Sequence, residues 1–278
     1  MKVTILGATG LLGNALLREW QGDDVQGFGV EHFDIRDARQ VQKIVHETRP
    51  DWIVLAAAYT DVDGCESNPE LALSVNRDGA VLVAEAAKQA GAKLLFLSTD
   101  YVFDGSKTTP YETGDARNPQ SVYGRSKAEA EVRLLETVPG CCIVRTAWLF
   151  GKGGKCFPDT IMKLAATRPT LDVVDDQRGC PTYSIDLAKA IIGLCRKDAS
   201  GIVQVTNAGS CSWFEFAREI VKEAGLTAVV RPASSGQMPR PARRPAYSVM
   251  SAASLDGFGL HMPSWPDALR RYLAERKS

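Results

Sequence analysis

The stretch KVTILGATGLLGNALLREW, residues 2–20, decides the fold class. It begins with an apolar run, continues through Gly7, Gly10 and Gly13, and ends with leucines at helical spacing. This order indicates a buried strand, a tight turn and a helix. Glycine suits the turn because the chain must bend sharply, and because a pyrophosphate must approach the backbone and the first amides of the helix. The stretch therefore predicts a dinucleotide-binding unit.

Apolar strands and amphipathic helices continue to alternate as far as about residue 150. Uninterrupted apolar strands between such helices are typical of a parallel sheet that is covered on both faces. We therefore expect an α/β protein, a Rossmann-type doubly wound parallel sheet with a smaller mixed α/β substrate-binding lid. The expected strands are 2–7, 25–30, 51–58, 92–99, 140–150 and 201–207, and the expected helices are 11–20, 38–48, 70–91, 121–136, 184–197, 212–225 and 265–277.

The chain is expected to divide into two parts. Residues 1–150 should form the dinucleotide-binding domain, with 184–207 returning to it, and 151–278 should form mainly the substrate-binding lid. A glycine-rich loop at 151–157 begins the second part, and a proline-rich stretch at 232–245 lies within it.

Composition and charge argue against several classes of function. The 33 basic and 33 acidic residues give a net charge of zero, so nothing indicates a nucleic-acid partner. No apolar run approaches the roughly 20 residues of a membrane span. The seven cysteines are scattered without a C-x-x-C pair and the three histidines stand apart, which disfavours structural zinc and favours a reducing cytoplasm. Scarce histidine also disfavours a Ser-His-Asp or Cys-His site.

The stretch SVYGRSK, residues 121–127, carries the candidate chemistry. Tyr123 and Lys127 are four residues apart and share one helix face. A tyrosine with its ordinary pKa near 10 is a poor base, and a neighbouring cation lowers that pKa. Thr99 ends a predicted strand, and we expect it to hydrogen-bond a reacting carbonyl while Tyr123 delivers the proton as hydride arrives. The alternative is a tyrosine and a lysine on a solvated helix face, and Y-x-x-x-K alone is a weak signal.

Motifs in order over nearly the whole chain resemble the extended short-chain dehydrogenases/reductases, and within them most closely the dTDP-4-dehydrorhamnose reductase family. STDYVFDG and DQRGCPT discriminate within that superfamily far better than Y-x-x-x-K does. The resemblance implies NAD(P)H-dependent reduction of dTDP-4-dehydro-L-rhamnose to dTDP-L-rhamnose, which supplies cell-surface polysaccharide. The stretches are GATGLLG (7–13), AAAYTDVDGCE (56–66), SVN (74–76), STDYVFDG (98–105), VYGRSK (122–127), RTAWLF (145–150), DQRGCPT (176–182) and RPAYSVM (244–250).

The resemblance also implies the roles of individual residues. It implies Thr99, Tyr123 and Lys127 as the catalytic set. On the substrate side it implies Asp100, Tyr101 and Trp148, with Asn76 supporting the proton relay. The implied cofactor site consists of Gly7, Thr9, Gly10, Leu11, Leu12, Gly13, Asp34, Ile35, Ala56, Ala57, Ala58, Tyr123 and Lys127.

Two of these expectations leave alternatives open. An acidic residue about twenty positions after the glycines would bind the adenosine ribose, but Glu31 comes late for that role. Asp34 and Ile35 are therefore expected to flank the adenine, as the equivalent pair does in short-chain reductases, and both NADH and NADPH stay open, with NADPH slightly favoured. Trp148 is expected to end a strand and pack on the deoxyhexose. The alternative is an aromatic ring that fills the gap between sheet and lid.

Two differences from related families reduce the number of reactions and oligomeric states that we expect. Tyr101 follows Asp100 where sugar-nucleotide 4,6-dehydratases carry a glutamate, so simple ketone reduction is favoured over elimination of water. Ala15 and Ile185 stand where some family members have the glutamates of a magnesium-bridged dimer. We therefore expect no metal site and a monomer or weak homodimer. The remaining alternatives are a reductase or epimerase of another nucleotide sugar, or a non-catalytic regulatory subunit like that of methionine adenosyltransferase.

Overall fold

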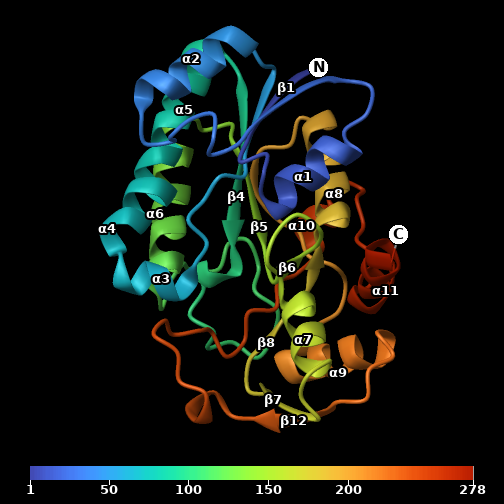
Figure 1. Ribbon diagram of the computed structural model, residues 1–278. Helices are drawn as coiled ribbons and strands as arrows, with labels where there is room; N and C mark the ends of the chain where they lie inside the picture. The colour runs from blue at the N-terminus through green and yellow to red at the C-terminus, as the bar shows by residue number, and fades with distance from the viewer. Residues whose placement is uncertain (278) are drawn as a thin grey trace.

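The computed structural model describes residues 1–277 and is built around one six-stranded parallel sheet. Its strands lie in the order β10-β5-β4-β3-β1-β2 (Figure 1). The chain returns from the edge strand β2 across β1 to β3, so the direction of winding changes beside β1. A ligand crevice is expected there, at the carboxyl ends of the strands. The strands are β1 Lys2–Leu6, β2 Asp24–Phe28, β3 Trp52–Leu55, β4 Lys93–Thr99, β5 Cys142–Thr146 and β10 Gly201–Gln204.

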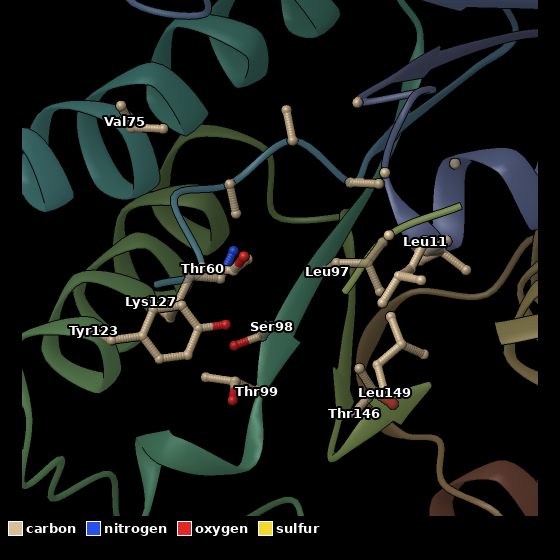
Figure 2. A pocket seen from close by; sticks show the side chains of 18 of the residues that line it. Leu11, Thr60, Val75, Leu97, Ser98, Thr99, Tyr123, Lys127, Thr146 and Leu149 are labelled. Atoms are coloured by element: carbon tan, nitrogen blue, oxygen red, sulfur yellow. The ribbon is translucent and has the colours of Figure 1, made fainter. Parts of the chain in front are cut away.

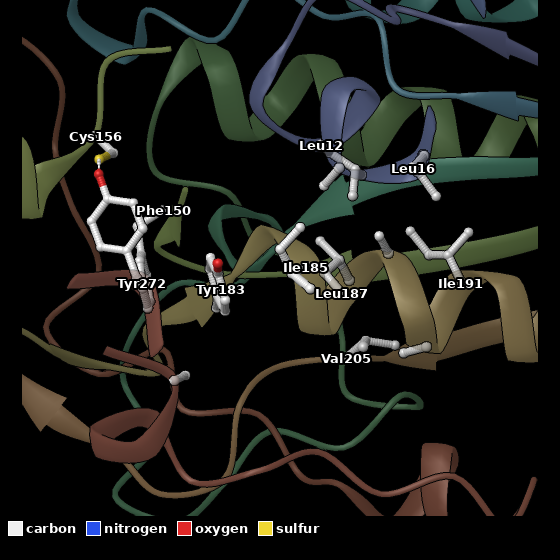
Figure 3. Packing of buried hydrophobic residues seen from close by; sticks show 14 of the residues in the cluster. Leu12, Leu16, Phe150, Cys156, Tyr183, Ile185, Leu187, Ile191, Val205 and Tyr272 are labelled. Carbon is white, nitrogen blue, oxygen red and sulfur yellow. Dashed lines mark hydrogen bonds between the residues drawn. The ribbon is translucent and has the colours of Figure 1, made fainter. Parts of the chain in front are cut away.

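Helices cover both faces of this sheet, which confirms the predicted fold class. One face carries α2 (Ala38–Thr48), α5 (Gly79–Ala90) and α6 (Val122–Thr137), and the other carries α1 (Leu11–Glu19) and α8 (Ser184–Arg196) (Figure 1). The apolar faces of α1 and α8 meet in a buried cluster that includes the labelled side chains of Leu12, Leu16, Ile185, Leu187 and Ile191 (Figure 3). Each such side chain contributes about 1.5–3 kcal/mol when it is fully buried.

A smaller α/β layer lies beyond the carboxyl ends of the strands, toward which the arrow of β4 points (Figure 1). It contains a parallel strand pair with two helices, and the chain ends in α11 (Trp265–Lys277). Two short pairs connect it to the rest of the protein. The elements are α7 Phe157–Ala165, α9 Trp213–Glu223, the pair β7 Thr170–Val174 and β12 Val229–Ala233, the pair β8 Arg178–Gly179 and β11 Cys211–Ser212, and the pair β6 Leu149–Phe150 and β9 Thr182–Tyr183.

Local signals in the sequence locate several elements closely. The helix predicted over 38–48 has those bounds, and Asp37 caps it by accepting from the amides of Arg39 and Gln40. At α9, Ser212 and Glu215 form the predicted capping box. Gly91 ends α5 in the left-handed conformation, with φ 68°.

The helix predicted over 70–91 is instead three segments, α4 (Pro69–Leu73), a π-helical turn (Ser74–Asp78) and α5. The wider turn contains Asn76, whose buried amide reaches inward to the backbone of Tyr59 and to Ser126 on α6. A π-helical turn is a local insertion of this kind and often accompanies a functional site.

The strand predicted over 140–150 is also wrong beyond residue 146. β5 ends at Thr146, and Trp148 has a left-handed φ of 47°. The chain therefore turns out of the sheet, and Leu149 and Phe150 pair with Thr182 and Tyr183 instead.

Several elements were not predicted from the sequence, among them α3 (Val62–Ser67), α7 and the pair β7–β12. Each of them has at most nine residues, which is shorter than the window of about 11–18 residues over which a helical period is judged. Within residues 1–277, no helix combines the length and the apolarity needed to cross a membrane.

Candidate active site

A cavity of about 990 Å³ lies at the carboxyl ends of β1, β3, β4 and β5. Its walls come from the glycine turn, the loops after β2 and β3, the first turns of α6 and one lid helix. Every residue that the sequence analysis assigned to the site lines this cavity except Asn76. Segments far apart in the sequence are thus brought together at the edge of the sheet where ligands bind in such folds.

The glycine turn forms a concave backbone surface, here called the glycine cradle, at one end of the cavity. Gly7 has φ 97°, and a Cβ there would lie 2.4 Å from the Ala57 nitrogen. A Cβ at Gly13 would lie 2.2 Å from the Gly7 oxygen, whereas one at Gly10 would approach nothing closer than 3.5 Å. Gly7 and Gly13 are therefore needed because no side chain fits there, whereas Gly10 leaves open space beside the backbone. Helix α1 has no side-chain cap and no acidic residue in its first turn, so its first amides remain available to an anion.

The far end of the cavity carries an ion pair next to the predicted adenine contacts. Asp34 and Ile35 line the wall together with Arg36, whose Nε lies 2.9 Å from Asp34 Oδ1. The Arg36 guanidinium also lowers the pKa of the Asp34 carboxyl. Glu31 does not line the cavity and lies beside His32, with its Oε1 3.0 Å from Nδ1.

The three predicted catalytic side chains face one part of the cavity (Figure 2). Tyr123 and Lys127 reach in from α6, and Ser98 and Thr99 lie opposite them at the end of β4. The Lys127 ammonium lies 3.9 Å from the ring centroid of Phe96. Helix α6 begins at this edge because Ser121 caps it by accepting from the Gly124 amide.

Burial changes the acid–base properties of both α6 residues. Lys127 is 2 % exposed, and burial lowers the pKa of its ammonium to about 7 despite an opposing effect of Glu131. Burial also raises the pKa of Tyr123, and the Thr99 hydroxyl offsets only part of that rise. The sequence argument expects Lys127 to lower the pKa of Tyr123, but in the protein alone desolvation is the larger effect. The protonated phenol is the form that can donate a proton to a ketone.

Two buried polar atoms next to Thr99 lack hydrogen-bond partners within residues 1–277. They are Oδ2 of Asp100 and Oγ1 of Thr146, and Thr146 stands opposite Thr99 in the β4–β5 register. Asp100 is 1 % exposed, and burial raises its pKa to about 6, although Ser248 and Thr99 act in the other direction. Unpaired buried polar atoms are costly, so their place in the cavity wall indicates a polar ligand.

Asn76 lies outside the cavity and makes three hydrogen bonds within the protein. Its Oδ1 accepts from the Tyr59 amide at 2.8 Å, and its Nδ2 donates to the Tyr59 oxygen and to Ser126 Oγ, each at 3.0 Å. Ser126 in turn donates to the Tyr123 carbonyl at 2.7 Å. Asn76 is therefore connected to the backbone of Tyr123 through Ser126. Its own amide is buried and does not line the cavity.

Trp148 lines the cavity but already has packing partners in the protein. Its ring stacks on Trp213 of α9 with the centroids 3.4 Å apart and the planes inclined by 6°. A Cβ at Gly179 would lie 2.5 Å from the Trp148 ring, so the glycine makes room for it. The indole thus packs between the sheet and the lid. Because it also lines the cavity, its position allows both a contact with the deoxyhexose and a packing role.

Several residues of the cavity wall were not predicted, including Arg36, Thr60, Lys155 and Trp213. Lys155 belongs to the glycine-rich loop at 151–157, and Arg36 directly follows the Asp34-Ile35 pair. Both residues adjoin motifs that the sequence analysis had identified, so they could have been assigned to the cavity wall from the sequence. Trp213 carried none, because its approach to the cavity depends on how the lid folds.

The described part of the chain contains no group of three or more His, Cys, Asp or Glu side chains arranged to hold a metal ion. Ala15 and Ile185 are both buried in the apolar cluster of α1 and α8. All seven cysteines are buried and none forms a disulfide.

Comparison with known proteins relates the whole chain to one family. Residues 1–278 match the model described as the RmlD substrate binding domain. The spore coat polysaccharide biosynthesis protein SpsK of Bacillus subtilis is 39 % identical over 100 % of this chain and 98 % of its own. A dTDP-4-dehydrorhamnose reductase of Mycobacterium tuberculosis is 40 % identical over 98 % and 92 % of the two chains. The structure of a dTDP-4-dehydrorhamnose reductase of Bacillus anthracis in complex with NADP has a TM-score of 0.95, with 41 % identity and coverage of 99 % and 100 %.

Proposed function

The chain belongs to the RmlD substrate binding domain family, and on that premise we propose that it reduces the 4-keto group of dTDP-4-dehydro-L-rhamnose to give dTDP-L-rhamnose. One observation carries the proposal: Tyr123, which is half-buried, and Lys127, which is buried, face Thr99 across a cavity that begins at a glycine cradle. Tyr101 follows Asp100 where elimination of water would need a second carboxylate. The site is therefore equipped to deliver a proton to a ketone but not to dehydrate a sugar.

The cofactor supplies a hydride to the ketone carbon when it is bound. We propose that the glycine cradle and the first amides of α1 bind its pyrophosphate, and that Asp34 and Ile35 flank its adenine. Thr9, Leu11 and Leu12 of the glycine turn, and Ala56, Ala57 and Ala58 after β3, are proposed to complete the cofactor site, and all six line the cavity. Lys127 is proposed to hold the nicotinamide ribose while presenting its charge beside Tyr123.

The proton is proposed to come from the Tyr123 phenol. As negative charge develops on the ketone oxygen, Tyr123 donates its proton and Thr99 donates a hydrogen bond to the same atom. Thr99 Oγ1 donates to Asp100 Oδ1 at 3.0 Å in the protein alone, so this hydroxyl must rotate when substrate binds. The resulting phenolate is stabilised when Lys127 is protonated, because an opposite charge nearby favours the ionised form.

The sugar is proposed to lie between Asp100, Tyr101 and Trp148. Oδ2 of Asp100 can accept from a sugar hydroxyl without losing a bond in the protein. The ring of Tyr101 packs edge-on against that of Tyr123, with the centroids 5.7 Å apart, and so limits where the ketone can lie. The apolar edge of Trp148 provides a surface for the deoxyhexose. Asn76 acts behind the site, through Ser126, rather than on the sugar.

We propose NADPH as the preferred cofactor. A carboxylate after the second strand binds the ribose 2′-hydroxyl of NADH, whereas an arginine accommodates the 2′-phosphate of NADPH. Arg36 lines the cavity and Glu31 does not, which supports the second case. The NADP complex of the Bacillus anthracis relative supports the same preference.

The remaining proposals concern the assembly and the setting. Ala15 and Ile185 offer no carboxylate for a metal bridge, which supports a monomer or a weak homodimer. The division into a dinucleotide-binding domain, 1–150 with 184–207, and a lid, mainly 151–278, is supported by the pairing of β10 with β5 in the central sheet. Unbridged cysteines support a reducing compartment such as the cytoplasm.

The decisive experiment is NADPH oxidation by the purified protein with dTDP-4-dehydro-L-rhamnose, with analysis of the product sugar. We expect stoichiometric formation of dTDP-L-rhamnose. Faster turnover of another dTDP- or UDP-linked 4-keto sugar would assign a related substrate. Absence of NADPH and NADH oxidation with every such sugar would refute the reductase and favour a regulatory subunit.

A further inference from the structure

A buried ion-pair network lies directly behind the catalytic wall and is centred on Glu131 of α6. The Glu131 side chain is fully buried, and its two oxygens accept four hydrogen bonds. Oε1 accepts from Ser98 Oγ at 2.5 Å and from Arg145 Nε at 2.9 Å. Oε2 accepts from Arg145 Nη2 and from Arg117 Nε, each at 2.6 Å. Arg145 is likewise fully buried.

Stability alone is a weak reason for such a network. Burying an ion pair costs several kcal/mol per ion, and a well-packed apolar replacement is often equally stable. The place of this network suggests a different reason. Ser98 immediately precedes Thr99, and Glu131 lies one helical turn after Lys127, whose side chain projects from the same face of α6.

Two neighbouring contacts join the catalytic helix to the catalytic strand. Phe96 and Ser98 are alternate residues of β4 and therefore share one face of the strand. Phe96 packs under the Lys127 ammonium, with the nitrogen 3.9 Å from the ring centroid, and Ser98 bonds to Glu131. Successive turns of α6 are thus attached to successive same-face positions of β4.

We propose that Glu131 is a positioning residue for the reaction. Through Ser98 it holds the end of β4, and hence Thr99, in register with α6. Its negative charge also balances the buried cations beside it, Lys127 included. This proposal rests on the function proposed above, because it assigns Glu131 a part in the same proton delivery.

The charges around Lys127 support the second part of the proposal. Burial lowers the pKa of Lys127 to about 7, and Glu131 is the group that opposes this effect. Arg145 and Arg117 keep the pKa of Glu131 low, so its carboxylate remains ionised. The other ionisable groups on α6 and on the elements packed against it are Tyr123, Arg125, Glu129, Glu131, Arg133 and Glu136 of α6, Lys93 of β4, Asp100 and Tyr101 after β4, Arg145 of β5, Arg117 before α6, Asp63, Cys65 and Glu66 of α3, Glu70 of α4, Arg77 and Asp78 of the π-helical turn, and Glu85 and Lys88 of α5.

Glu131→Gln tests the charge while keeping the shape of the side chain. Glu131 acts to raise the pKa of Lys127, so removing its charge should lower that pKa, and we expect a fall of about one unit. Lysine is cationic below its pKa, and the proposed role needs the cation. The high-pH decline of kcat/KM should therefore move to lower pH by the same amount, with kcat reduced about tenfold or more.

The pKa of Lys127 can be measured without cofactor or substrate. Protein labelled with ¹³Cε-lysine is titrated by NMR, and Lys127→Met assigns the resonance. This measurement separates the proposed role of Glu131 from the proposed reductase function. If the wild-type protein reduces no 4-keto sugar, the proposed function fails, whereas the response of Lys127 to Glu131 is still decided by the titration.

Two further variants act as controls. Asp186→Asn removes a carboxylate that is 5 % exposed and paired with Arg271, but Asp186 lies on α8, on the opposite face of the sheet. It should lower the melting temperature and leave both the Lys127 titration and the pH profile unchanged. Ser98→Ala keeps the Glu131 charge, so it should lower kcat without moving the pH profile.

Arg117→Gln keeps the proposal testable if Glu131→Gln does not fold. Arg117 is partly exposed, and its removal leaves more of the Glu131 charge unbalanced, so the pKa of Lys127 should rise. An unchanged Lys127 titration in Glu131→Gln or in Arg117→Gln would overturn the charge balance. Wild-type kcat in Ser98→Ala, or an equal loss of kcat in Asp186→Asn, would overturn the positioning role.

Discussion

The glycine turn allows cofactor binding and folding to be changed separately, with Gly10→Ala and Gly13→Ala as a matched pair. Both substitutions add one methyl group to the same turn. At Gly10 the new Cβ would lie 3.5 Å from its nearest neighbour, the Gly7 oxygen, and would occupy the open side of the cradle. At Gly13 it would lie 2.2 Å from that oxygen and 2.5 Å from the Ala8 Cα. The first variant should therefore impair binding and the second should impair folding.

The magnitudes follow from these contacts. Displacing the pyrophosphate by a methyl group removes at least one hydrogen bond to a charged group, worth about 1.5–3 kcal/mol. Because about 1.4 kcal/mol is a tenfold change in affinity, Gly10→Ala should weaken NADPH binding about tenfold or more. Its cost to folding is at most about 1 kcal/mol, through loss of a favourable N-cap residue.

For Gly13→Ala the overlapping backbone atoms cannot move aside cheaply. Overpacking typically costs about 1–3 kcal/mol, and the gain in helix propensity on replacing glycine by alanine returns about 1 kcal/mol. A net loss of about 1 kcal/mol, the middle of this range, corresponds to a melting temperature lower by roughly 2–4 °C in a chain of this size.

Fluorescence titration with NADPH and thermal unfolding of the protein without cofactor measure the two effects. Gly10→Ala with wild-type affinity would refute the placement of the pyrophosphate against that glycine. Gly13→Ala with a wild-type melting temperature would show that the turn relaxes more freely than its contacts indicate.

Four further predictions concern the proposed chemistry. Tyr123→Phe should bind NADPH normally and lose at least about a hundredfold in kcat, since general acid catalysis contributes about 10²–10⁴; near-normal turnover would remove Tyr123 from that role. Trp148→Ala should raise KM for the sugar nucleotide and leave NADPH affinity nearly unchanged, whereas joint loss of both affinities with a lower melting temperature would indicate a purely packing role. Arg36→Ala should reduce kcat/KM for NADPH about tenfold or more and change that for NADH little; equal losses with both would contradict recognition of the 2′-phosphate. Activity should survive dialysis against EDTA, because Ala15 and Ile185 supply no metal ligand, and magnesium-dependent recovery after a loss would refute this.

Local patterns in the sequence were sufficient for most of the central sheet and its helices. Buried parallel strands need continuous apolar runs and helices need caps, so β1, α2 and α9 could be located from residues within one turn of each boundary. The candidate catalytic set could be predicted for a similar reason. Tyr123 and Lys127 are four residues apart on one helix, and Thr99 ends a strand whose carboxyl end must lie at the ligand-binding edge.

Tertiary contacts decided the features that no local pattern contains. Trp148 leaves the sheet with a left-handed backbone, and its ring packs on Trp213, which lies 65 residues later in the sequence. Asn76 lies in a π-helical turn, and its amide bonds to the backbone of Tyr59, 17 residues away. The network around Glu131 joins Ser98, Arg117 and Arg145, and none of these contacts has a spacing that the sequence displays.

The protonation states of Tyr123 and Lys127 are also decided by tertiary contacts. From the sequence, the separation of Tyr123 and Lys127 suggests a cation that lowers the pKa of a phenol. In the folded protein both groups are withdrawn from water, which opposes charge on each of them. Spacing along a helix determines which groups are neighbours, but desolvation depends on everything packed around them. The sequence could therefore identify the reacting groups, and only the tertiary structure decided which protonation states they favour.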